Sequence, residues 1–189
     1  MIMKYFSLLF MLCFLPLQAN SQVINYEADG NLAPTHKVGC VPLKDARREY
    51  TPADLAVAVV KCADRKDYDT AVDLFILMQL RAAYDTKRVK DRTAHQAGDV
   101  LGINIRNTLG STRLKKLQAA FNKFGGNNSP RHKAFCALMK RQGPPKYHPT
   151  YMIQHGITAF TGREGNGLVR GFRPQKVWRD LLKGYMKCS

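Results

Sequence analysis

Two helix-start motifs stand far apart in this chain of 189 residues and constrain its fold more than any other feature. In Thr51-Pro52 and in Ser129-Pro130, a hydroxyl residue directly precedes a proline. A hydroxyl at the N-cap accepts a bond from the helix backbone, and proline suits the first helical position because it has no N–H to leave unpaired. Asp54 adds a carboxylate near the positive end of the first helix. The two motifs predict helices over 52–64 and 130–142.

Apolar residues at helical spacing predict further helices between and after these two. Gly110-Ser111, Gly125-Gly126-Asn127-Asn128 and Gly143-Pro144-Pro145 interrupt the pattern. The additional helices are expected to start near 67 or 69 and end near 84, and to cover 91–108, 112–124, 151–160 and 177–186. No segment alternates convincingly like a strand, although Leu168-Val169 could form a short one. We therefore expect an all-α protein, a compact helical domain of about six or seven helices that opens with a helical hairpin.

The first 19 residues follow the order of a secretory signal peptide. A short positive start through Lys4 precedes an apolar run from Tyr5 to Leu17, and Ala19 is the small residue at the expected cleavage point. The run of about 13 residues is shorter than the ~20 that a membrane-spanning helix needs. An uncleaved anchor is the alternative, whereas lipidation of Cys13 is not expected because no small residue precedes it.

The remaining chain is predicted to have two parts. Residues 20–50 read as an extended lead-in, and residues 51–189 as a single helical domain with no transmembrane segment. We expect the protein to be exported, to the periplasm or outside the cell.

Four cysteines remain after the signal peptide: Cys40, Cys62, Cys136 and Cys188. An even number in an exported chain favours two disulfides, with three possible pairings. Cys40 precedes the helix that carries Cys62, and the other two lie in the last third, so we expect Cys40–Cys62 and Cys136–Cys188. A zinc site is the competing interpretation, but the spacings are not those of zinc ligands. No metal or other cofactor is expected.

Residues 63–75, Ala63-Asp64-Arg65-Lys66-Asp67-Tyr68-Asp69-Thr70-Ala71-Val72-Asp73-Leu74-Phe75, resemble the turn and second helix of a tetratricopeptide-type repeat. In that family a tyrosine and an alanine near the turn let two helices pack closely. The resemblance covers residues 51–84, and no second copy follows at a 34-residue period. It implies a helical hairpin and a protein-binding role, and it brings no catalytic residues.

The positive charge is confined to the second half. Residues 20–99 hold 12 Lys and Arg against 12 Asp and Glu, whereas residues 100–189 hold 17 against 2. Of the net charge of +16, one unit belongs to Lys4 and 15 to the second half. Self-repulsion of this size favours an anionic partner over a basic face without one. The candidate binding residues are Lys115, Lys116, Arg131, Lys133, Lys140 and Arg141.

An acidic protein is the preferred partner, and an anionic cell-wall polymer or lipid is the alternative. Routine binding of nucleic acid is not expected, because such sites interleave exposed aromatic residues with basic ones. Here Phe121, Phe124 and Phe135 fall on helix faces assigned to the core, as do Trp178 and Tyr185 in the last helix.

No catalytic residue is assigned. His95, His132, His148 and His155 match no metal-ligand motif, although His148 and His155 could act as acid and base in a small nuclease. Glu164, in a glycine-rich loop, could be the acid of a glycan hydrolase, but such enzymes commonly need a second carboxylate.

The first functional hypothesis is an exported, non-enzymatic helical binding protein whose basic half docks an acidic partner. In size, export and composition alone, the chain is similar to small periplasmic immunity proteins, which neutralise toxins delivered by neighbouring bacteria. The second hypothesis is a secreted hydrolase acting on cell-wall glycan or nucleic acid. A third is a binder of surface polymers without a defined protein partner.

Overall fold

The structure is a computed structural model that describes residues 27–162 and 165–188. The predicted signal peptide at 1–19 and Glu164 lie outside the described residues. The described chain is helical, and it contains no β-strand, although Val89 and Leu168 form an isolated antiparallel bridge. The elements are η1 (Leu43–Asp45), α1 (Pro52–Asp64), α2 (Tyr68–Asp85), η2 (Arg92–Gln96), α3 (Ala97–Phe124), α4 (Pro130–Gln142), α5 (Thr150–Ile153), α6 (Thr158–Thr161) and α7 (Pro174–Gly184).

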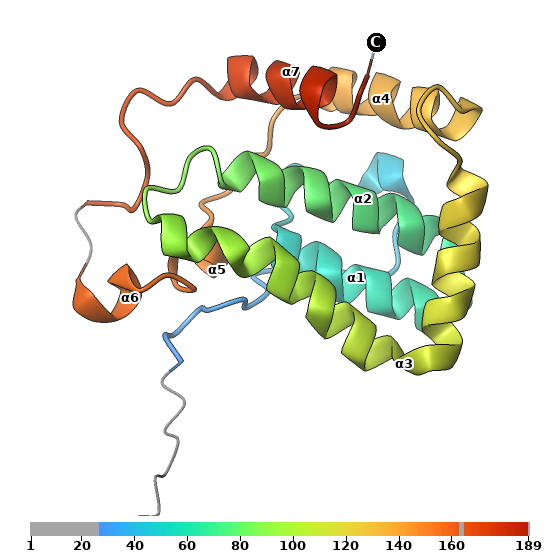
Figure 1. Ribbon diagram of the computed structural model, residues 1–189, viewed down its shortest axis with the longest axis horizontal. Coiled ribbons are helices and arrows are strands. Elements are labelled where there is room, and N and C mark those ends of the chain that lie inside the picture. The colour runs from blue at the N-terminus through green and yellow to red at the C-terminus, as the bar shows by residue number, and fades with distance from the viewer. Residues whose placement is uncertain (1–26, 163–164, 189) are drawn as a thin grey trace, which may run out of the picture.

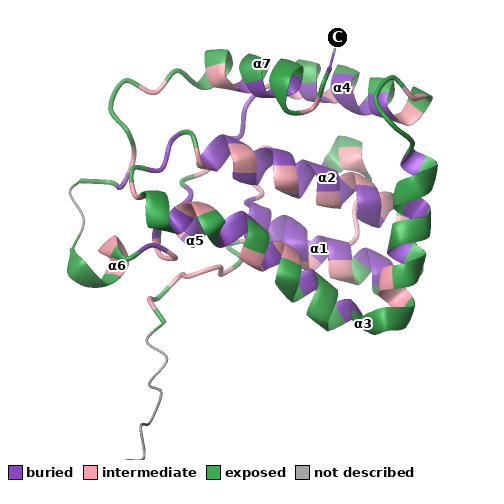
Figure 2. Ribbon diagram, viewed as in Figure 1, coloured by how far each residue is buried: buried purple, intermediate pink, exposed green. Residues whose placement is uncertain are grey.

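Helices α1 and α2 form the expected hairpin, and the first half of α3 packs against both of them (Figure 1). Their facing sides are buried, and α2 has buried residues along its whole length because α1, α3 and α7 all contact it (Figure 2). Leu55, Leu74 and Leu77 are fully buried at this centre. The hairpin is therefore the core on which the remaining helices are placed.

Both cap-plus-proline predictions are confirmed. The Thr51 hydroxyl accepts the N–H of Asp54 at 3.1 Å, and the Asp54 carboxylate accepts the N–H of Thr51 at 2.7 Å, which completes a capping box. Ser129 caps α4 in the same way, by accepting the N–H of His132 at 3.1 Å. These local interactions fix where α1 and α4 begin.

Gly110 bends α3 where the sequence predicted one helix to stop and another to start. Its φ of 65° and ψ of 177° are not helical, and the second half of α3 runs in a different direction from the first (Figure 1). Arg113 donates to the carbonyl oxygens of Thr108 and Leu109 and pairs with Asp64 of α1. The bend brings the end of α3 towards α4.

The prediction of one helix over 151–160 is wrong. The segment instead forms two single turns, α5 and α6, separated at Gly156. A Cβ on Gly156 would lie 2.4 Å from Oδ2 of Asp91, and that same oxygen accepts the N–H and hydroxyl of Thr158. A carboxylate distant in sequence therefore ends the helix.

Three other boundaries also differ from expectation. The segment predicted to begin a helix at 91 starts as the 3-10 turn η2, and α7 runs from Pro174 to Gly184 rather than from 177 to 186.

In the lead-in, residues 27–50 contain the 3-10 turn η1 but no α-helix.

Both disulfides pair as predicted, Cys40 with Cys62 and Cys136 with Cys188. The first ties the lead-in to α1, and the second ties the C-terminal residues to α4. Within the described ranges, no helix is both long and apolar enough to cross a membrane.

Candidate functional site: a basic groove

Helices α4 and α7 lie side by side at one edge of the molecule (Figure 1). Trp178 of α7 is 3% exposed and donates its indole N–H to the carbonyl oxygen of Met139 in α4 at 3.1 Å. Its ring also meets Tyr84 of α2 edge to face. Because a buried indole N–H needs an acceptor, this bond fixes the position of α7 along α4.

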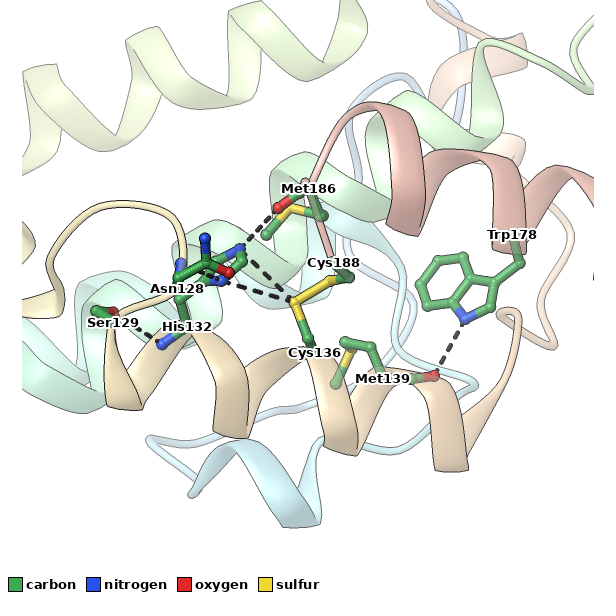
Figure 3. The surroundings of a disulfide bond; sticks show 8 residues. All are labelled: Asn128, Ser129, His132, Cys136, Met139, Trp178, Met186 and Cys188. Atoms are coloured by element: carbon green, nitrogen blue, oxygen red, sulfur yellow. Dashed lines mark hydrogen bonds between the residues drawn. A yellow bond between two sulfur atoms is a disulfide. The ribbon is translucent and has the colours of Figure 1, made fainter.

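The C-terminal segment, residues 185–188, is folded back onto α4 (Figure 3). Lys187 has a φ of 56°, and the turn lets the N–H of Cys188 donate to the carbonyl of Leu182 at 2.8 Å. Nε2 of His132 lies 2.7 Å from the carbonyl oxygen of Met186, and Nδ1 accepts the N–H of Asn128. A carbonyl only accepts, so the contact with Met186 is a hydrogen bond that Nε2 of His132 donates.

Between α4, α7 and the C-terminal segment lies a groove of about 650 Å³, which we call the basic groove. Trp178 and Leu182 form its apolar floor. None of the described residues that line it is acidic, and Asp180 of α7 instead pairs with Lys176 at 2.7 Å. The four cations that line it are Lys140, Arg179, Lys183 and Lys187.

Local geometry explains how these cations converge. Arg179 and Lys183 are four residues apart and so share one face of α7. Lys140 stands on α4, and the left-handed turn at Lys187 keeps that residue at the groove. Cations held along apolar walls attract an anion more strongly than cations spread over an open surface, because field lines concentrate in the cleft.

A smaller depression of about 230 Å³ adjoins the basic groove. Both are lined by Asn128 and Lys140, and Lys133 lines the smaller one. Of the six predicted binding residues, the structure therefore places Lys140 in the groove and Lys133 beside it.

The other predicted binding residues lie elsewhere. Lys115 and Lys116 are exposed on the second half of α3, and Arg141 is exposed on α4, but none of the three lines the groove. Arg131 joins α4 to α2, with ion pairs to Asp69 at 3.0 Å and Asp73 at 2.7 Å. Its guanidinium also lies over the Phe124 ring.

Sequence reasoning did not single out Arg179, Lys183 and Lys187, although it counted their charge. The available signals were the four-residue spacing of the first two and the place of Lys187 beside a disulfide cysteine. Neither signal shows that α7 faces α4.

The histidines weighed as an acid–base pair have separate hydrogen-bond partners. His148 contacts the Thr150 hydroxyl and the Asn166 carbonyl, whereas His155 contacts the side chain of Asn31. Burial lowers the pKa of His155, although Glu27 acts in the opposite direction. The His148 ring therefore joins the start of α5 to Asn166, and the His155 ring joins the end of that segment to the lead-in.

His132, Cys136 and Cys188 place their ligand atoms within 4.8 Å of one another. Both sulfur atoms belong to the disulfide, so neither is a thiolate that could bind a metal ion. This cluster anchors the C-terminal segment.

The fold and the groove together define a disulfide-linked, all-helical protein with a basic groove at one edge. Searches against protein families, characterised proteins and solved structures return no match to this chain. The resemblances to a tetratricopeptide-type hairpin and to periplasmic immunity proteins stay predictions.

Proposed function

We propose that the protein is an exported, non-enzymatic binding protein that captures an acidic polypeptide in the basic groove. The observation that carries this proposal is the convergence of Lys140, Arg179, Lys183 and Lys187 over an apolar floor with no acidic lining residue among those described. Complementary charge of this kind speeds encounter and selects against cationic partners.

The apolar floor favours a polypeptide over a sugar-phosphate polymer. Trp178 and Leu182 are each 3% exposed and line the groove together with the aliphatic stems of its cations, so the groove offers apolar surface as well as charge. A polypeptide brings carboxylates and apolar groups together and suits such a lining. The two disulfides are compatible with an oxidising compartment, as the predicted signal peptide also implies. Neutralising an acidic toxin, as an immunity protein does, is one specific form of this function.

The test uses Trp178, the one tryptophan of the chain, as the reporter in the groove. Octaglutamate is titrated into the protein at low and high salt, and vesicles of phosphatidylglycerol and soluble polyphosphate are titrated in parallel. We expect octaglutamate to change the Trp178 fluorescence saturably, with affinity falling as salt rises. Tighter saturable binding of vesicles or polyphosphate than of octaglutamate would contradict a polypeptide partner.

A matched pair of variants tests the position of the site. Arg179→Glu with Lys183→Glu reverses two charges in the groove, and Lys115→Glu with Lys116→Glu makes the same net change on α3. Exposed ion pairs are worth about 0.2–1 kcal/mol each, and charge reversal adds repulsion of similar size at both positions, so the groove variant should bind about tenfold more weakly. The α3 variant should lose less than half of that free energy. Equal losses in the two variants would show that net charge, not the groove, attracts the ligand.

A further inference from the structure

A second cavity, of about 480 Å³, lies between α2, the end of α3 and the C-terminal segment. We call it the aromatic cavity. Its lining is apolar apart from a few neutral polar groups, and none of the described lining residues carries a formal charge. The residues that line it are Phe75, Ile76, Gln79, Phe121, Phe124, Gly125, Gly126, Asn127, His132, Tyr185 and Met186.

Two aromatic side chains of this cavity are unexpectedly exposed. Helical spacing predicted Phe121 and Tyr185 to be in the core, but they are 43% and 51% exposed, which corrects that prediction. Phe124, on the same helix, is buried as predicted. Partial burial raises the pKa of the Tyr185 hydroxyl, and the negative charge of Asp99 raises it further. The hydroxyl therefore stays neutral at physiological pH. Large exposed aromatics beside a cavity are typical of the residues that dominate binding energy in interfaces.

The C-terminal segment is a wall shared by the two cavities. Tyr185 and Met186 line the aromatic cavity, and the next two residues, Lys187 and Cys188, line the basic groove. The loop before α4 is divided in the same way, because Asn127 lines the aromatic cavity and Asn128 lines the basic groove. One bound chain that crosses this wall therefore contacts both sites.

We propose that the acidic segment captured in the basic groove carries a large aromatic side chain that inserts between Phe121 and Tyr185 into the aromatic cavity. This inference rests on the proposed function and specifies its ligand. Because Met186 and Lys187 are consecutive residues of the shared wall, the two cavities adjoin, and the aromatic residue lies close to the acidic run in the peptide. Four cations match several carboxylates better than the single headgroup of an anionic lipid.

The experiment measures fluorescence anisotropy of labelled peptides bound to the full mature chain. The probes have six glutamates joined to one phenylalanine, and six glutamates joined to one alanine in its place, each made in both orders. We expect the phenylalanine peptide to bind about tenfold more tightly in one order. Phe121→Ala with Tyr185→Ala should abolish that gain while leaving the affinity for the alanine peptide unchanged.

Two further variants keep the result decisive. Phe160→Ala removes an aromatic of similar exposure from α6, outside the cavity, and should retain the gain. Gln79→Trp fills the aromatic cavity from its half-buried wall without removing apolar surface, so it should abolish the gain even if the double variant is unstable.

The outcomes separate this inference from the proposed function. If both peptides bind equally, the aromatic anchor is wrong and the basic groove remains the site. If neither peptide binds, the proposed function itself fails. If Phe160→Ala removes the gain as fully as the cavity variants do, insertion into this cavity is refuted.

Discussion

Replacing Asp54 with asparagine tests how the lead-in is held on α1. The fully buried Asp54 carboxylate accepts the N–H groups of Thr35 and His36 on Oδ1, at 2.6 and 2.8 Å. On Oδ2 it accepts the N–H of Thr51 at 2.7 Å and contacts the Thr35 hydroxyl and the His36 ring. One side chain therefore caps α1 and fastens residues 35–36 to it.

An asparagine side chain has one acceptor oxygen, so it cannot accept hydrogen bonds both from residues 35–36 and from Thr51. In its better orientation the oxygen keeps the two N–H groups of Thr35 and His36, and the amide NH₂ faces the buried N–H of Thr51. A buried N–H left without an acceptor costs about 1–3 kcal/mol, and the remaining bonds lose their charge. We expect a loss of about 2–3 kcal/mol, which lowers the Tm by roughly 5–10 °C in a domain of this size.

The pH dependence gives a second, independent readout. Burial raises the pKa of Asp54, but the hydrogen bonds from Thr51 and His36 outweigh it, so the pKa lies below its usual 3.8. A carboxyl group with a lowered folded-state pKa adds stability above pH 3.8 that is lost as the pH falls through the folded-state value. The difference between wild type and Asp54→Asn should therefore shrink as the pH falls below 3.8.

Urea unfolding followed by circular dichroism measures both effects. The control is Asp180→Asn, which breaks an exposed pair with Lys176 and should change stability by less than about 0.5 kcal/mol. Unfolding of Asp54→Asn at the wild-type urea midpoint would refute the role of Asp54 as a shared acceptor. A gap between the two proteins that stays constant down to pH 2 would also contradict it.

Three more predictions concern other parts of the fold. Replacing Cys136 and Cys188 with alanine opens a link across 52 positions and should cost about 4 kcal/mol in urea unfolding, with weaker octaglutamate binding because the groove wall is released. Gly110→Ala should destabilise by about 1–3 kcal/mol because its φ of 65° disfavours a side chain, whereas Gly102→Ala, in the helical part of α3, should be neutral or stabilising. Partial burial raises the pKa of Asp91, but hydrogen bonds from Thr93 and Thr158 outweigh it and lower the pKa to about 2. The stability that Asp91 contributes should therefore be lost as the pH falls from 3.8 towards 2, and this pH dependence should be absent in Asp91→Asn.

The sequence predicted the helices that local interactions define. Thr51 and Ser129 accept N–H groups three residues further on, so their motifs locate helix starts without reference to the rest of the chain. Gly110 likewise marks a bend because its backbone conformation is disfavoured for other residues. The disulfide pairing was predictable because Cys40 shortly precedes the helix that carries Cys62, and because Cys136 and Cys188 both lie in the last third of the chain.

Two predictions were wrong because residues distant in sequence decided the outcome. The helix over 151–160 is interrupted because Asp91 bonds Thr158 and leaves no room beside Gly156. Helical spacing identified the apolar face that carries Phe121, but it could not show how far neighbouring elements cover that face. The ion pairs of Arg131, a predicted binding residue, with two carboxylates of α2 likewise depend on the fold and not on the local sequence.

By itself, the sequence determined an all-helical chain with two disulfides and a positive charge confined to its second half. The tertiary structure decided which cations line one groove. Lys140 and Lys183 are 43 positions apart, and they share a groove because the Trp178 bond to Met139 and the Cys136–Cys188 bond hold α7 and the C-terminal segment against α4. Charge is a property of composition, whereas a binding site needs charges converging in space, and only packing between distant helices supplies that convergence.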